Sequence, residues 1–99
     1  MEIALRVFRE KSADANPYYP SSEGIYNCVR TVRELIENAG ANVITITRIA
    51  GGHRSDIQND AEVDISILLC EKINQTEYIS SVEDICKKYD VKWLEIREK

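Results

Sequence analysis

The residues best placed to do chemistry in this chain are His53 and Arg54, which directly follow Gly51 and Gly52. An imidazole, a guanidinium and glycine amides could converge on a small anion, because all three can donate hydrogen bonds to it. A Gly-Gly pair that does not open a helix lacks the context of a phosphate-binding loop. The sequence therefore favours a flexible hairpin here, and we keep His53 and Arg54 as candidate ligand-binding residues.

A second candidate site is the polar stretch NPYYPSSEG, which precedes the first predicted helix. Its two prolines interrupt helix and strand hydrogen bonding, and a connection of about a dozen residues is long enough to be functional. Tyr18 and Tyr19, close to Asn16, could wall a pocket for a small metabolite. The alternative, that the two rings only hold the loop against the body of the protein, is favoured.

No set of residues has the spacing of a catalytic or metal site. Asp56, Asp60 and Glu62 offer oxygen ligands suited to Mg²⁺ or Ca²⁺, but they match no calcium-loop spacing, so a solvated loop is favoured. The three cysteines form no CxxC pair and there is one histidine, so zinc is not expected. No nucleophile has a recognisable base beside it. We predict a protein that is not an enzyme and holds no metal or cofactor.

The composition is that of a globular protein with a modest negative charge. Hydrophobic residues make up 43% of the 99 residues, charged residues 30%, and the net charge is -4. This balance disfavours nucleic-acid binding, which depends on neutralising phosphates with Lys and Arg. No apolar run approaches the roughly 20 residues of a transmembrane helix, and the charged start does not resemble a signal peptide. We expect a single cytoplasmic domain over residues 1–99, without membrane insertion.

The spacing of apolar residues predicts six elements that position these loops. Alternation predicts strands over residues 1–9, 41–49, 63–70 and 91–97, and a repeat of three and four predicts helices over 25–39 and 74–90. Gly40 ends the first helix and Asn74 caps the second. This β-α-β-β-α-β order predicts a ferredoxin-like α+β sandwich. Its four-stranded antiparallel sheet has the first and third strands central and two helices on one face.

The apolar side chains assign faces to these elements. The first helix has one apolar stripe: Ile25, Cys28, Val29, Val32, Leu35, Ile36 and Ala39. Alternation turns Ile46, Leu94 and Ile96 toward the helices. It places nine side chains on the open sheet face: Arg6, Phe8, Thr45, Thr47, Ile49, Ser66, Leu68, Val91 and Trp93.

The open sheet face is more apolar than a solvated face needs. We therefore predict that it is an interface with a second copy, as a homodimer, or with a neighbouring domain, although an ordinary partly apolar surface is the alternative. RNA binding through stacked aromatics is not favoured, because the third strand presents Asp64, Ser66 and Leu68 there.

The segment NAGANV, residues 38–43, resembles the G-x-N-x turn that leads into the second strand of ACT-type small-molecule-sensing domains. The ending SVEDICKKYDVKWLEI is similar to the closing helix and strand of the ACT-like cytosolic tail of MgtC/SapB membrane proteins. The resemblance implies a dimeric sensing module whose ligand contacts residues 16–24 together with Gly40 and Asn42. The long first loop departs from the short glycine-containing turn of ligand-binding ACT domains, which puts amino-acid binding in doubt.

Three functions are consistent with these observations. The first is a non-enzymatic regulatory, ligand-sensing or dimerisation domain, including the cytosolic part of an MgtC/SapB-type protein. The second is a stand-alone adaptor that binds a protein partner on the open sheet face. The third is a small ferredoxin-like enzyme with its site at the first loop and His53. The first is preferred.

Overall fold

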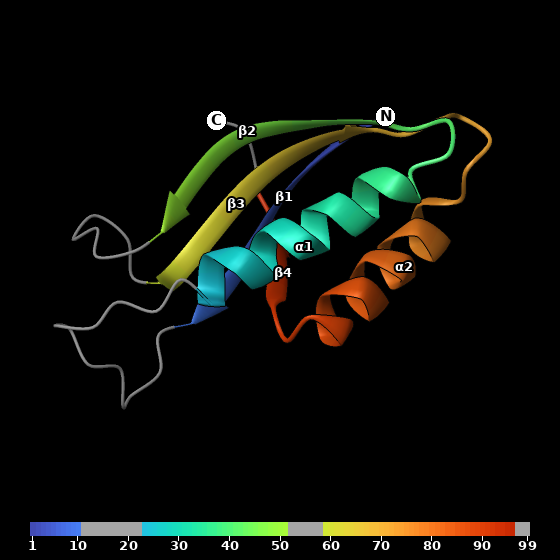
Figure 1. Ribbon diagram of the computed structural model, residues 1–99. Helices are drawn as coiled ribbons and strands as arrows, with labels where there is room; N and C mark the ends of the chain where they lie inside the picture. The colour runs from blue at the N-terminus through green and yellow to red at the C-terminus, as the bar shows by residue number, and fades with distance from the viewer. Residues whose placement is uncertain (11–22, 52–58, 97–99) are drawn as a thin grey trace, which may run out of the picture.

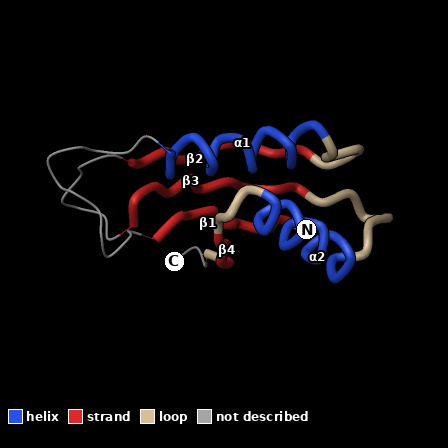
Figure 2. Tube along the Cα trace, turned by 60° about the horizontal axis from the view of Figure 1, so that its bottom comes forward, coloured by secondary structure: helices blue, strands red, loops and turns tan. Residues whose placement is uncertain are grey.

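The computed structural model, described here over residues 1–10, 23–51 and 59–96, is a four-stranded sheet with two helices. The elements follow the order β1 (Glu2–Glu10), α1 (Glu23–Glu37), β2 (Val43–Gly51), β3 (Asn59–Leu68), α2 (Gln75–Lys88) and β4 (Lys92–Glu95). The sheet is antiparallel with strand order β2-β3-β1-β4. Both helices lie on one face of it (Figures 1 and 2). The predicted ferredoxin-like sandwich, with first and third strands central, is confirmed.

The core lies between the helices and the two central strands. Alternate residues of β1 and β3 point into it, and each is at most 3% exposed: Ile3, Leu5, Val7, Val63, Ile65 and Ile67. Helix α1 contributes Cys28, Val32 and Leu35, and α2 contributes Val82 and Cys86. Burial of this set offsets the chain entropy lost on folding, because each large apolar side chain contributes roughly 1.5–3 kcal/mol.

The helix ends follow their local chemistry. The Asn74 side-chain oxygen accepts hydrogen bonds from the backbone amides of Thr76 at 2.9 Å and Glu77 at 3.2 Å, which caps α2 as predicted. After α1 the chain turns at Gly40, whose φ of +62° is the left-handed conformation that favours glycine. Gly40 therefore allows the chain to turn from α1 toward β2, and Asn74 fixes the point at which α2 begins after β3.

Strand β2 contains an irregularity that reverses the face of its second half. Its pairing with β3 shifts between Ile46 and Arg48, which leaves Thr47 without a register partner. After the shift Ile49 lies opposite Val63, a core residue, and Arg48 lies opposite Asp64. The placement of Ile49 on the open sheet face was therefore wrong, because an extra residue in one strand breaks strict alternation.

The faces of β4 are also the reverse of those predicted. Trp93 pairs with the buried Val7 and packs against the core, and Val91 is itself 7% exposed. Leu94 pairs with Arg6 on the open sheet face and is 42% exposed. Asp90, whose φ is 56°, forms a tight turn just before this short strand. The open sheet face thus loses Ile49, Val91 and Trp93, and gains Arg48 and Leu94.

Candidate interaction groove

An apolar groove lies between helix α1 and the edge strand β2. Its volume is about 390 Å³, and its walls are Val29 and Ile36 from α1 with Ile46 and Ile49 from β2. These four side chains are 44–50% exposed, so each leaves a large part of its apolar surface in water. Val32 and Val63 are buried residues that also line the groove. Exposed aliphatic residues gathered in one concave patch are typical of an interaction surface.

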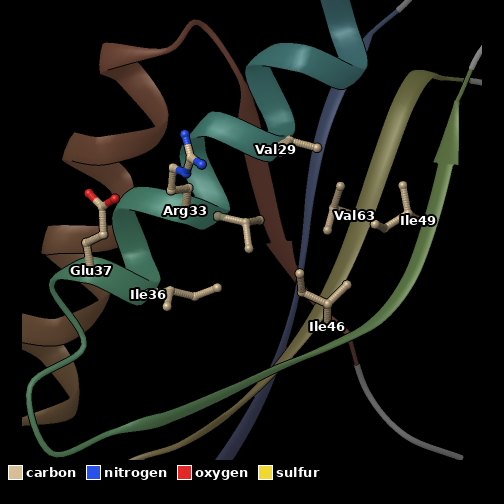
Figure 3. Close-up of a pocket in the computed structure, with 8 residues that line it drawn as sticks. Val29, Arg33, Ile36, Glu37, Ile46, Ile49 and Val63 are labelled. Carbon is tan, nitrogen blue, oxygen red and sulfur yellow. The ribbon is translucent and has the colours of Figure 1, made fainter.

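The close-up in Figure 3 shows how the groove is built. Ile36 and Val29 extend from α1 toward β2, and Ile46 and Ile49 extend from β2 toward the helix. Arg33 and Glu37 also border the groove, but their charged ends point away from the other lining residues (Figure 3). The groove therefore has an apolar interior and a charged rim.

Strand β2 is an edge of the sheet, because it pairs only with β3. Eight of its nine residues are exposed or partly exposed, and only Ala50 is buried. An edge strand offers a row of backbone N–H and C=O groups that another strand can pair with. The groove and the free edge lie side by side along the same element.

The open sheet face carries an ion-pair cluster made of Arg6, Arg48, Glu62 and Asp64. The Arg6 guanidinium donates two hydrogen bonds to the Asp64 carboxylate, at 2.8 and 3.1 Å. Arg48 donates one to Glu62 at 2.8 Å, and Asn59 donates another at 2.9 Å. Glu62 and Asp64 are 5% and 8% exposed, so their charges are compensated inside the cluster. This face is more polar than the sequence suggested.

The pKa of Glu62 is lowered from its ordinary value. Burial by itself raises the pKa, but the hydrogen bonds from Arg48 and Asn59, with the positive charges of Arg6 and Arg48, outweigh it. The cluster is also tied to β2, because Thr47 donates a hydrogen bond to the Asp64 backbone carbonyl at 3.1 Å. Glu62 therefore acts as a structural anion, not as one of the cation ligands considered with Asp56 and Asp60.

The described part of the chain holds two buried cysteines and one that is partly exposed, all with free thiols. Burial raises the pKa of both Cys28 and Cys86 to about 12. Protonated thiols are poor nucleophiles and poor metal ligands, so both act as small core residues. Within residues 1–10, 23–51 and 59–96 no three His, Cys, Asp or Glu side chains gather where they could hold a metal ion.

Five of the seven predicted site residues lie outside the described residues: Asn16, Tyr18, Tyr19, His53 and Arg54. The other two, Gly40 and Asn42, line a second cavity of about 240 Å³ beside Ile73 and Tyr78. The Asn42 side-chain oxygen accepts a hydrogen bond from the Cys70 backbone amide at 2.9 Å, so it also has a structural task. Ligand binding by these seven residues stays a prediction.

The groove was not among the predicted sites. Val29 and Ile36 belong to the apolar stripe of the first helix, and a single stripe predicts that all of its residues pack against the core. The stripe is wider than one sheet can cover, because the structure buries Cys28, Val32 and Leu35 and leaves Val29 and Ile36 exposed. The sequence feature that points to the groove is therefore an apolar stripe on α1 that is wider than the buried face of the helix.

No model of a known protein family and no curated protein matches this sequence. Solved structures do match its fold. A hydantoinase/carbamoylase family amidase from Burkholderia ambifaria aligns with a TM-score of 0.62 and 13% identity, over 99% of this chain and 27% of its own. The structure of AtUAH in complex with glyoxylate aligns at 0.56 and 15%, over 97% and 27%. An amidase of the same family from Burkholderia phymatum aligns at 0.52 and 12%, over 98% and 28%.

These matches correct the resemblance drawn from the sequence. The structures that match this chain along almost its whole length include hydantoinase/carbamoylase family amidases, so the link to the ACT-like tail of MgtC/SapB proteins was wrong. The chain spans only about a quarter of each matched structure's length, and identities of 12–15% establish a shared fold alone. Among the described residues, neither helix has the length and apolar character needed to cross a membrane.

Proposed function

We propose that this chain is a non-enzymatic self-association module whose contact surface is the free edge of β2 together with helix α1. One observation carries the proposal: the unpaired edge and four exposed aliphatic side chains adjoin a single apolar groove. Covering that groove with a second copy removes apolar surface from water on both molecules. Self-association was expected from the sequence, and the proposal moves it from the open sheet face to this edge.

The choice of surface follows from comparing the two candidates. The open sheet face is occupied by Arg6, Arg48, Glu62 and Asp64, whose charges already compensate one another. Burying such a cluster under a partner removes water from charged groups without new pairs, which is costly. The groove beside β2 carries no comparable cost, because its walls are aliphatic.

The matched amidases support a scaffold role and nothing finer. In each of them the aligned part is about a quarter of the chain, so a unit of this fold can accompany other parts of a protein. We propose that the present chain shares this scaffold and does no chemistry with it. The two buried thiols are protonated, and Glu62 is committed to its ion pairs.

Sedimentation velocity on matched edge variants tests the proposal. Ile46→Lys places a charge in the groove, and Leu94→Lys places the same charge at a residue of similar exposure, 42% against 45%, on the opposite edge strand. The wild type is expected to be a dimer. Ile46→Lys should weaken it at least about 30-fold, the loss typical of a hot-spot residue worth about 2 kcal/mol.

The control Leu94→Lys should leave the dimer intact. Thermal unfolding of both variants verifies that each is folded, as expected for partly exposed positions. A wild type that stays monomeric at several hundred micromolar would overturn the proposal. Equal weakening by both lysines would overturn the choice of edge.

A further inference from the structure

Arg33 and Glu37 are two exposed, opposite charges one helical turn apart on the rim of the groove. Within the described residues neither makes an ion pair or a hydrogen bond through its side chain. Their neighbours on α1 differ: Glu34 is paired with Lys88 of α2, and Arg30 donates a hydrogen bond to the Tyr26 hydroxyl at 2.9 Å. The two charges beside the groove are thus left available to a partner.

We infer that two copies associate about a two-fold axis that sets their α1 helices antiparallel, with Arg33 of each copy paired to Glu37 of the other. The inference rests on the proposed function and adds the orientation and the residues that select it. In a two-fold interface, if residue i contacts residue j then j also contacts i. Charges of opposite sign at positions 33 and 37 therefore form two equivalent ion pairs, one on each side of an axis that lies at the level of residue 35 along the helix.

The opposite orientation is disfavoured by the same two residues. A two-fold axis parallel to the helices would place Arg33 against Arg33 and Glu37 against Glu37. Like charges held close together repel, so the pattern selects against parallel helices as well as for antiparallel ones. The positive charge at position 33 and the negative charge at position 37 complement each other when two copies are related by this two-fold axis. This self-complementarity favours a second copy of the chain over a partner of unrelated sequence.

Strand β2 requires the same axis. Two edge strands related by a two-fold axis perpendicular to the sheet pair in the antiparallel sense. Helix α1 lies along β2 on one side of the sheet, so this axis also relates the two helices in the antiparallel sense (Figures 1 and 2). Ile36 and Ile46 face each other across the groove, which places the last turns of α1, where Arg33 and Glu37 lie, level with the middle of β2 (Figure 3). One operation therefore satisfies the strand edge, the apolar groove and the charged rim.

Charge reversal distinguishes this inference from the proposed function. We would measure dimer dissociation constants by sedimentation at low salt for Arg33→Glu, Glu37→Arg and the double variant. Each single reversal turns two attractive pairs into two repulsive pairs and should weaken the dimer at least tenfold. The double variant restores opposite charges and should return to within about threefold of the wild type. Arg30→Glu makes the same change in net charge away from the groove and should have little effect.

The most direct test of the pairing between Arg33 and Glu37 is a mixture of the two single variants. With one of them ¹⁵N-labelled, native mass spectrometry should show the mixed dimer in large excess over either homodimer, because only the mixed dimer has two attractive pairs. If the wild type dimer is lost with Ile46→Lys but indifferent to all reversals, the orientation is overturned and the proposed function stands. If the mixture shows no preference for the mixed dimer, the pairing of Arg33 with Glu37 is overturned. A monomeric wild type overturns both.

Discussion

The two edge strands of the sheet, β4 and β2, differ in how well they are protected from pairing with another molecule. Strand β4 has four residues, two of them charged, and Lys92 is paired with Glu10 of the neighbouring strand at 3.0 Å. Strand β2 has nine residues with one charge, and two of its aliphatic side chains lie exposed in the groove under α1. Short length and charge protect an edge from unwanted pairing.

The difference shows where a fold of this kind can recruit a partner. Both edge strands belong to one sheet and pack against the same core. Their different exposure to a partner therefore follows from their own sequences. The β4 edge is protected by its own residues, and the β2 edge is left to be covered by something else. Helix α1 leaves room for that cover, because its stripe extends past the core to Val29 and Ile36.

The largest effect is expected from a substitution in the core that supports both edges. Ile65 is 1% exposed at the centre of β3, and Ile65→Ala leaves a cavity there. We expect the free energy of unfolding to fall by about 2–5 kcal/mol. Urea unfolding followed by circular dichroism measures the loss, and Ile46→Ala at the exposed edge serves as the control. A loss no larger than that of Ile46→Ala would show that the core does not lie where the structure places it.

A smaller effect should loosen β2 alone. Glu62→Gln removes the anion that holds Arg48 of β2 and should destabilise the protein by about 1 kcal/mol at pH 7, a value reduced for the partial exposure of Arg48. The pKa of Glu62 is lowered in the folded protein, so its contribution is fully present above its ordinary pKa of 4.5. It is lost as the pH falls through the lowered value.

Unfolding of wild type and Glu62→Gln at several pH values between 7 and 3 measures this contribution. The difference in stability between them should shrink toward zero in acid. A constant difference across this range would contradict the assigned role of the Glu62 charge.

The smallest effect should be at the protected edge. The pair between Lys92 and Glu10 joins two side chains that are each at least 60% exposed, so Lys92→Ala should change stability by less than about 0.5 kcal/mol. It should also leave the association state unchanged in sedimentation. New higher-order association of Lys92→Ala would contradict this expectation, and would show that the charge of Lys92, and not the short length of β4, protects this edge.

The fold could be predicted from the sequence because each long element repeats its apolar residues at one period. Strand β3 alternates Val63, Ile65 and Ile67 against polar residues, and α1 has a stripe at three and four. The faces of β4 could not be predicted. Its sequence VKWLEI carries apolar residues in both phases, so tertiary packing of Val91 and Trp93 decides the face.

The groove required information that periodicity does not contain. The shift after Ile46 turns Ile49 toward α1, and a bulge of this kind has no signature among the threonines that surround it. The charges of Arg33 and Glu37, four residues apart, do not mark an interface in the sequence, because such a pair is also typical of a solvated helix face. The candidate loops around Tyr18 and His53 were chosen by residue type alone, and they lie outside the described residues.

Amide hydrogen exchange, measured by NMR over a range of protein concentrations, tests the central claim most directly. The account predicts that amides of β2 exchange more slowly as concentration rises, because a second copy pairs with that edge, while amides of β4 exchange at a constant rate. Protection of β4 in place of β2, or exchange at both edges that is independent of concentration while the protein dimerises, would contradict it.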